Sequence, residues 1–304
     1  PPRSTLFPYT TLFRSAKQLS MDRIVAIKIL SNEYRSDPYL NEMFLKEARA
    51  VAKLNNENIV AGYDFGEKNG ISYFVMEYVD GSSLYKKLKS SPQEKLSVEE
   101  TISIGIQVAK ALEHANNKGL VHRDIKPENI LINSSGVAKL CDLGLAQKIE
   151  PNSGKKPRGF GTPAYMSPEQ IRCEPDIDVK GDIYALGIVL YRTIFGILPF
   201  TGTTREIMAK QIEEKVKFPA DNMDKAKTEL AKIIVKAMAK KKEERYSPSE
   251  LVEELTNLQM KLKSGIEEEP KKEEKDKISI PKVKMIPRHT MALKGQSLRK
   301  KRKE

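Results

Sequence analysis

The sequence predicts an α+β fold of two lobes, a small β-rich lobe followed by a large α-helical lobe. Segments rich in β-branched and aromatic residues are concentrated before residue 80, whereas helical periodicity dominates after it. The chain has 304 residues, of which 39% are hydrophobic and 31% charged, and this suits a soluble domain with its own core. We expect the lobes to join near residues 77–81.

The small lobe is predicted from two strands and a helix. Residues 24–30 are apolar except for Lys28, which indicates a buried strand with one polar interruption. A helical pattern over residues 37–54 places Glu47 beside an apolar face. Residues 71–79 are β-branched and aromatic, and the glycine and serines that follow them end this second strand.

The large lobe is predicted to be mainly helical. Ser97 and Glu100 form a capping box for a helix that ends near Gly119. Two short strands are expected at residues 130–132 and 138–140. The pattern that opens at Ser247 predicts the last helix.

Composition bears on whether the protein is secreted, membrane-spanning or cytoplasmic. The two cysteines lack metal-ligand spacing, which indicates free thiols in a reducing compartment, and no segment reads as a signal peptide. The longest apolar run, residues 184–200, contains Arg192 and is short for a membrane span, so we expect a buried helix there. These observations favour a cytoplasmic protein, or the cytoplasmic part of a membrane-anchored one.

The strongest chemical signal is VHRDIKPENILI at residues 121–132, followed ten residues later by an aspartate. Phosphoryl transfer requires positioning and charge compensation more than covalent help from the protein. Asp124 could orient an acceptor hydroxyl and take its proton, and Lys126 could neutralise charge on the moving group. Asn129 and Asp142 offer the hard oxygen ligands that Mg²⁺ prefers.

These residues resemble the motif set of protein kinases. The set comprises VAIK at residues 25–28, the helical Glu47, HRDIKPEN, DLG at 142–144, and SPE within GTPAYMSPEQ at 161–170. DIYALG at 182–187 and ERY at 244–246 also match. The sequence is similar to the bacterial eukaryotic-like serine/threonine protein kinases, and this resemblance implies the two-lobed protein kinase-like fold.

The resemblance also implies a nucleotide site. Lys28, held by Glu47, would bind the α- and β-phosphates of ATP. Adenine would lie between Ala26 and Leu131. Met76 would be the gatekeeper, and the backbones of Glu77 and Val79 would hold adenine. The implied cofactors are ATP and Mg²⁺, with Mn²⁺ as an alternative.

The activation segment and the substrate class follow from the same resemblance. Thr162 would contact Asp124 and Lys126, as in kinases that act on Ser and Thr, and Glu169 would pair with Arg245. Protein substrates carrying Ser or Thr are therefore expected, in bacterial signalling. Ser153 is the natural phosphorylation candidate in a segment that is otherwise poor in hydroxyl groups.

The two ends of the chain differ from the domain between them. Residues 1–15 resemble a translated sequencing adapter, so we expect a non-native segment that takes the place of the first strand and the glycine-rich loop. The kinase domain would then span residues 16–264, with its small lobe at 16–79 and its large lobe at 80–264. Residues 265–304 are rich in Lys, Glu and Pro, which predicts a disordered basic tail.

Three alternatives remain open at this stage. A pseudokinase scaffold with weak or no turnover is the main rival to an active enzyme. A small-molecule kinase is less favoured, because GTPAYMSPEQ belongs to a platform for protein substrates. The five basic residues at 299–303 could contact an anionic membrane surface or stay solvated; nucleic acid is the least favoured partner because no aromatic residues interleave them.

Overall fold

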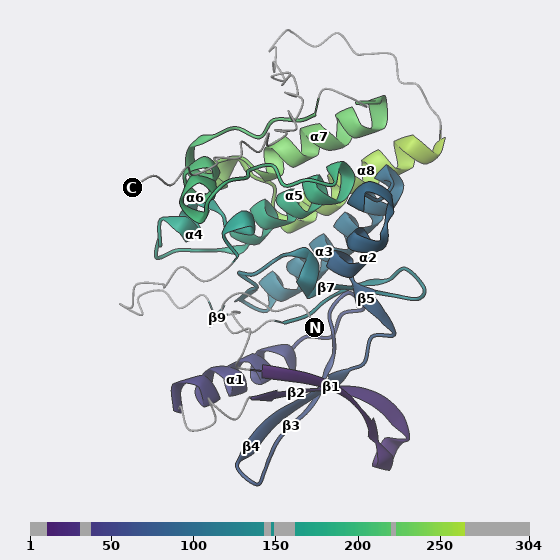
Figure 1. Ribbon diagram of the computed structural model, residues 1–304, viewed down its shortest axis with the longest axis vertical. Helices are drawn as coiled ribbons and strands as arrows, with labels where there is room; N and C mark the ends of the chain where they lie inside the picture. Colours follow the sequence, from purple (N-terminus) through teal and green to yellow (C-terminus); the bar gives the residue numbers. More distant parts are fainter. Residues whose placement is uncertain (1–10, 31–37, 143–146, 149–161, 220–222, 265–304) are drawn as a thin grey trace, which may run out of the picture.

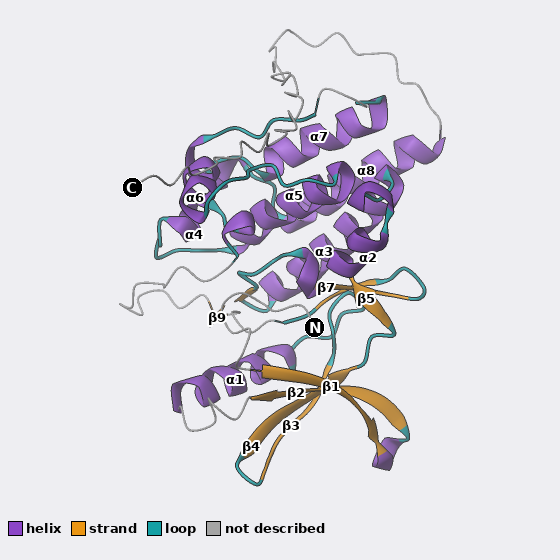
Figure 2. Cartoon of the chain, viewed as in Figure 1, coloured by secondary structure: helices purple, strands orange, loops and turns teal. Residues whose placement is uncertain are grey.

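The computed structural model describes residues 11–30, 38–142, 147–148, 162–219 and 223–264, and these form two lobes (Figure 1). The small lobe holds a four-stranded antiparallel sheet of order β1-β2-β4-β3 and one helix, α1 (Pro38–Val51). Its strands are β1 (Thr11–Gln18), β2 (Arg23–Leu30), β3 (Gly62–Lys68) and β4 (Ile71–Glu77). Figure 2 shows how the strands gather in this lobe and the long helices in the other.

The large lobe is built from seven helices within the described residues. They are α2 (Leu84–Ser90), α3 (Val98–Asn117), α4 (Pro168–Ile171), α5 (Val179–Phe195), α6 (Thr204–Glu213), α7 (Lys225–Ala237) and α8 (Pro248–Ser264). Two small sheets face the small lobe: β5 (Gly81–Ser83), β7 (Ile130–Asn133) and β8 (Ala138–Leu140) form one, and β6 (Leu120–Val121) with β9 (Gln147–Lys148) forms the other.

Strand β3 was not predicted from the sequence. Its residues, GYDFGEK, include two glycines and an aspartate, which are depleted in strands. The strand exists because it pairs with β4 along its length. A Cβ on Gly66 would lie 2.4 Å from the Tyr73 hydroxyl, so a side chain here would require Tyr73 to move. Tertiary pairing therefore overrides the local preference.

Strand β1 extends further back than the domain boundary predicted from the sequence. Residues 1–15 were placed outside the domain, yet the antiparallel register with β2 runs from Thr11 opposite Leu30 to Gln18 opposite Arg23. β1 lies at the edge of the sheet. The structure therefore takes five of those fifteen residues into the sheet, and the origin of the segment stays a prediction.

Helices α3 and α5 form the centre of the large lobe. Ser97 caps α3 by accepting from the Glu100 N–H, which is half of the predicted capping box, whereas the Glu100 carboxylate pairs with Lys87 at 2.8 Å. A Cβ on Gly105 of α3 would come within 2.9 Å of Leu190 on α5 and 3.0 Å of Leu255 on α8, so this glycine permits close packing of three helices. Helix α5 is buried almost throughout. Within the described residues, no helix combines the length and apolar character needed to cross a membrane.

The lobes are joined at a second place besides the chain connection after β4. The segment 58–61, which leads from α1 into β3, runs alongside β8 of the large lobe. The Leu140 N–H donates to the Asn58 carbonyl at 2.7 Å, and the Val60 N–H donates to the Leu140 carbonyl at 3.0 Å. The Asn58 amide also donates to the Ala138 carbonyl at 3.0 Å. This part of the small lobe is thus fixed to the large one.

A buried ion pair joins α4 to the segment that precedes α8. The Arg245 guanidinium donates to both carboxylate oxygens of Glu169, at 2.6 and 2.8 Å. The Arg245 side chain is 0% exposed and that of Glu169 is 4% exposed. Burial tends to raise the pKa of Glu169, but the hydrogen bond from Arg245 outweighs it and lowers the pKa. The pairing expected from the sequence is present.

Replacing Glu169 by Gln is expected to lower the free energy of unfolding by about 3 kcal/mol at pH 7, because Arg245 would keep a buried charge without its partner. Since the folded pKa of Glu169 is lowered, its stabilisation is full above the ordinary value of 4.5 and is lost as the pH falls below it. Urea unfolding of both proteins at several pH values measures this difference. Lys232→Met, which breaks an exposed pair with Glu229, is the control and should cost under about 1 kcal/mol. A difference between wild type and Glu169→Gln that stays constant down to pH 3.5 would contradict the assignment.

Candidate active site between the two lobes

A three-residue charge cluster lies where β2, α1 and the end of β8 meet. The Lys28 ammonium donates to both oxygens of Glu47, at 2.6 and 2.8 Å, and to Asp142 Oδ1 at 2.7 Å. Lys28 and Glu47 are only 4% and 6% exposed. The structure therefore brings together a lysine from the sheet, a glutamate from the helix and an aspartate from the large lobe.

Electrostatics favour the charged forms of Lys28 and Asp142 in this cluster. Burial alone would lower the pKa of Lys28, but the carboxylates of Asp142 and Glu47 raise it above its ordinary value. For Asp142, burial acts to raise the pKa and the Lys28 ammonium outweighs it, so that the pKa is lowered. Burial raises the pKa of Glu47 against the same ammonium. Lys28 is therefore protonated and Asp142 ionised at neutral pH.

A second cluster lies in the loop between β6 and β7. The Lys126 ammonium donates to Asp124 Oδ2 at 2.6 Å and to the Thr162 hydroxyl at 3.4 Å. The Asn129 amide nitrogen donates to the same Asp124 oxygen at 3.1 Å and to the Asp124 carbonyl at 2.9 Å. The Asp124 side chain, 12% exposed, is thus held by two neighbours while part of it faces solvent.

The two clusters are joined through the backbone. The Cys141 N–H donates to the Asn129 carbonyl at 2.9 Å, so the residue before Asp142 lies against Asn129. His122 Nε2 is 3.1 Å from the Cys141 carbonyl oxygen. Lys28, Asp142, Asn129 and Asp124 therefore belong to one continuous site.

Asp182 supports this loop and was missed as a functional residue by sequence reasoning. It stands in the first turn of α5, and its carboxylate accepts the N–H groups of His122 at 2.8 Å and Arg123 at 2.7 Å. Arg123 has a positive φ of 67°, a strained conformation for a non-glycine residue. Burial raises the pKa of Asp182 in spite of these donors. An acidic residue within an otherwise apolar helix was the signal available in the sequence.

The expected adenine residues line the junction of the lobes. Ala26 on β2 is the cross-strand partner of Met76 on β4. Ala26, Val79 and Leu131 are partly buried and pack against the core, whereas Met76 is buried within it. The structure thus places these four side chains in neighbouring elements at the lobe junction.

Glu77 uses its side chain in a way that the sequence did not suggest. The carboxylate binds the Lys139 ammonium of β8 at 3.0 and 3.1 Å and accepts the Ala61 N–H at 3.2 Å. The Glu77 N–H donates to the Ala61 carbonyl at 2.8 Å. This residue therefore links the start of β3, the end of β4 and β8. Lys139 was likewise missed, because nothing local marks a strand lysine as a partner of a residue 62 positions away.

Two sequence predictions in the activation segment have different outcomes. Thr162 lies next to Lys126, as stated above. Ser153 lies outside the described residues, as does Leu143 of the DLG motif. The structure therefore does not bear on phosphorylation of Ser153.

Comparison with known proteins assigns a family to this arrangement. A family model described as "Protein kinase domain" matches residues 11–255. The chain is 40% identical over 235 residues to a protein of Clostridium perfringens named probable serine/threonine-protein kinase CPE1738, covering 76% of this chain and 34% of that protein. It is 36% identical to serine/threonine-protein kinase PrkC of Bacillus subtilis, over 78% of this chain and 37% of the relative. For serine/threonine-protein kinase PknB of Mycobacterium tuberculosis the identity is 34%, over 76% and 38%.

The chain spans little more than a third of the length of these relatives. The family model, however, covers most of the chain and includes both charge clusters. The chain belongs to the protein kinase domain family.

Proposed function

We propose that this protein transfers the γ-phosphoryl group of ATP to Ser and Thr hydroxyls of other proteins. The observation that carries the proposal is the single continuous site in which Asp124, Lys126 and Asn129 lie against the Lys28–Glu47–Asp142 cluster. Each of the two clusters contains a lysine and an aspartate, the kinds of charged group that phosphoryl transfer requires. The names of the relatives support the same activity.

Each side chain then has a role that its contacts permit. Asp124, whose side chain is partly exposed, orients the acceptor hydroxyl and takes its proton as the bond to phosphorus forms. Lys126 is held beside Asp124 and offsets charge on the transferred group. Lys28, fixed by Glu47, binds the α- and β-phosphates. Ala26, Met76, Val79 and Leu131 enclose adenine, with the Glu77 backbone at its edge.

A divalent cation fits the remaining donors. Asn129 and Asp142 supply an amide oxygen and a carboxylate, and the backbone contact between Asn129 and Cys141 keeps them adjacent. These two oxygen donors suit Mg²⁺, an ion that takes few protein ligands and retains water and phosphate oxygens. When bound there, Mg²⁺ would neutralise charge on the β- and γ-phosphates.

Specificity for Ser and Thr over Tyr is supported by the contact between Lys126 and Thr162 at 3.4 Å. The contact joins Thr162 of the activation segment to Lys126, which in turn binds the proposed base Asp124. An acceptor hydroxyl must approach Asp124 along this segment, and a short side chain suits a site at this depth.

The proposal is tested by incubating the chain with γ-labelled ATP and a dephosphorylated protein such as casein, followed by analysis of the phosphorylated amino acids. Phosphoserine and phosphothreonine are expected, without phosphotyrosine. Tight nucleotide binding without any transfer would favour the scaffold alternative. Transfer only to small molecules would overturn the assignment of protein substrates.

Removal of divalent cations is expected to reduce phosphotransfer to background. Mg²⁺ should restore activity in a saturable way and Mn²⁺ should substitute for it, because both accept oxygen ligands in octahedral geometry. Initial rates in excess chelator and during back-titration measure this effect. Asn129→Ala should shift the titration to higher Mg²⁺, while Asn117→Ala, at the far end of α3, should leave it unchanged. Full activity in excess chelator would exclude the metal site.

Breaking the Glu77–Lys139 pair is expected to weaken ATP binding more than turnover. Lys139→Met removes the ammonium that holds the Glu77 side chain. KM for ATP should therefore rise about threefold while kcat stays nearly constant. A threefold change matches the free energy expected of a partly exposed ion pair. Steady-state kinetics against ATP measures the two constants. The reversed pair, Glu77→Lys with Lys139→Glu, should recover part of the loss. An unchanged KM in Lys139→Met would show that the pair has no positioning role.

Membrane contact of residues 299–303, one of the two possibilities left open above, stays a proposal, because residues 265–304 lie outside those the structure describes. Clustered Lys and Arg side chains are attracted to anionic headgroups by about 1 kcal/mol each. Sedimentation of the chain with phosphatidylserine vesicles, compared with neutral vesicles, tests it.

A further inference from the structure

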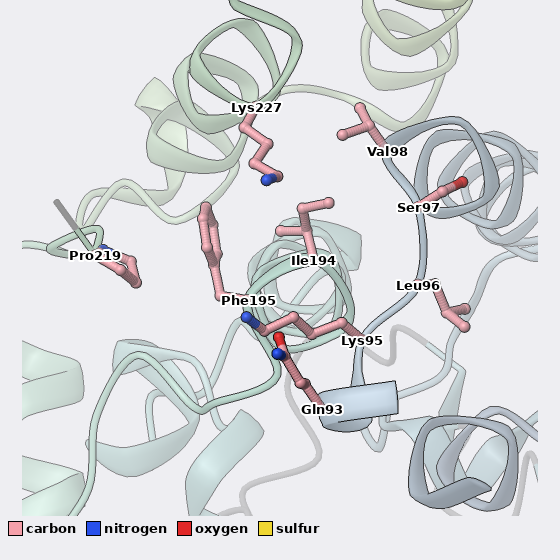
Figure 3. Close-up of a pocket in the computed structure, with 9 residues that line it drawn as sticks. All are labelled: Gln93, Lys95, Leu96, Ser97, Val98, Ile194, Phe195, Pro219 and Lys227. Atoms are coloured by element: carbon pink, nitrogen blue, oxygen red, sulfur yellow. The ribbon is translucent and has the colours of Figure 1, made fainter. Parts of the chain in front are cut away.

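A small cavity lies at the end of the large lobe formed by the start of α3, the end of α5 and the start of α7 (Figure 3). Its volume is about 270 Å³. Its apolar wall is formed by Leu96, Val98, Ile194, Phe195 and Pro219. A cavity of this size is smaller than most cofactor sites and suits one or two side chains of a peptide.

Two lysines reach the cavity from opposite sides. Figure 3 shows Lys227 extending from α7 toward Phe195, and Lys95 extending beneath the same ring beside Gln93. The Lys95 ammonium has no hydrogen-bond or ion-pair partner within the described part of the chain, and its stem lies over Gly196. The cavity therefore combines an apolar wall with positive charge on two sides.

The acidic groups nearby are already engaged. Glu94 binds Lys89 at 2.5 Å and also Arg192. Asp224 caps α7 by accepting the Lys227 N–H at 2.8 Å, and it pairs with the Lys227 ammonium at 3.4 Å. Asp224 thus offsets part of the charge of Lys227, whereas no acidic group among the described residues forms an ion pair with Lys95. An acidic occupant would complete the site.

The sequence that follows α8 has the matching chemistry. Residues 266–269 read IEEE, one apolar side chain followed by three carboxylates. They begin two residues after Ser264, the last residue of α8. The apolar side chain of this segment matches the apolar wall of the cavity, and its carboxylates match the two lysines.

The packing of α7 and α8 brings this segment within reach. The Lys236 ammonium lies 4.1 Å from the centre of the Tyr246 ring, so the last turn of α7 meets the start of α8. The two helices also pack against each other. In Figure 1 the yellow end of α8 lies on the same side of the lobe as the start of α7. Five residues beyond Ser264 can span up to about 17 Å when extended.

We propose that residues 266–269 dock in this cavity, with Ile266 against the apolar wall and the glutamates between Lys95 and Lys227. The contact is intramolecular, so its effective concentration is in the millimolar range and modest pairing suffices to populate it. It fixes the point at which the tail leaves the large lobe. The surface is separate from the phosphoryl-transfer site and does not depend on the proposed function.

Carbodiimide cross-linking of the 1–304 chain, read by mass spectrometry, tests the proposal because it joins only carboxylates and amines in direct contact. Glutamates 267–269 should couple to Lys95 or Lys227 about fivefold to tenfold more than Glu273 and Glu274 do, as expected for two partly screened ion pairs. The yield should fall in 0.5 M salt. The Asp176–Lys242 pair, joined across 66 positions, is the internal positive control.

Charge reversal sharpens the test. Lys95→Glu with Lys227→Glu should abolish the coupling. Adding Glu267→Lys, Glu268→Lys and Glu269→Lys should restore it, now between lysines of the tail and glutamates of the cavity. The proposal is overturned if glutamates 267–269 couple to neither cavity lysine in a wild-type sample that forms the Asp176–Lys242 product. It is equally overturned if the lysines couple to an added acidic peptide in preference to the tail, since the occupant is then a partner. The wild-type result stands even if a variant does not fold.

Discussion

Asp124→Asn should reduce the rate of phosphotransfer about 10²–10⁴-fold, the contribution expected of a positioned general base. The amide of Asn has nearly the same shape and can still accept the hydrogen bond from Lys126, so the loop should keep its geometry. What is lost is the carboxylate that takes the hydroxyl proton. Stability should therefore change little while turnover falls.

The measurement is kcat and KM for ATP, together with thermal unfolding of each variant. KM for ATP should stay within about threefold, because Asp124 contacts Lys126 and Asn129 and not the residues assigned to adenine. Asp176→Asn, which removes an exposed carboxylate paired with Lys242, is the matched control. Near-normal turnover in Asp124→Asn would remove this residue from its proposed role.

Lys28→Met should lower kcat/KM about 10²–10³-fold, since the phosphates lose their fixed positive partner. It should also lower the free energy of unfolding by about 3 kcal/mol, because Glu47 and Asp142 would face each other without the ammonium that now lies between them. The combined loss makes this the most damaging single change we expect in the small lobe.

Two further variants distinguish the effect of the charge of Lys28 from the effect of its exact position. Lys28→Arg keeps the charge but changes the geometry, and it should recover stability more than activity. Glu47→Gln leaves the Lys28–Asp142 contact in place, so its effect on kcat/KM should be about tenfold smaller than that of Lys28→Met. Urea unfolding and steady-state kinetics give both quantities. Wild-type kcat/KM in Lys28→Met would refute the role given to the ammonium.

The sequence was sufficient for elements whose local pattern agrees with their final environment. A lone lysine in an apolar strand predicted β2 and its buried Lys28, and the serine cap predicted the start of α3. The helix expected over residues 37–54 ends earlier, at Val51. Helix ends depend on the last few hydrogen bonds, which sequence periodicity locates only within a few residues.

Features that depend on distant partners could not be predicted in this way. Strand β3 contradicts its own residue preferences and exists through β4. The Glu77–Lys139 pair and the bonds from His122 and Arg123 to Asp182 join residues about 60 positions apart. Only folding brings them together. The candidate site was predictable residue by residue from its motifs, whereas its supporting contacts were not.

The attachment of residues 58–61 to β8 has a mechanical consequence. A rigid body fixed at two neighbouring places can turn only about the line that joins them, and each point then moves in proportion to its distance from that axis. The axis runs beside Ala61 and Glu77, which are bonded to each other and to Lys139. Met76 therefore lies close to the rotation axis, whereas the turn at Leu19–Met21, at the far end of the sheet in Figure 1, lies far from it. A rotation about this axis would leave the Ala26–Met76 pair nearly in place and displace the parts of the sheet that lie farther from it.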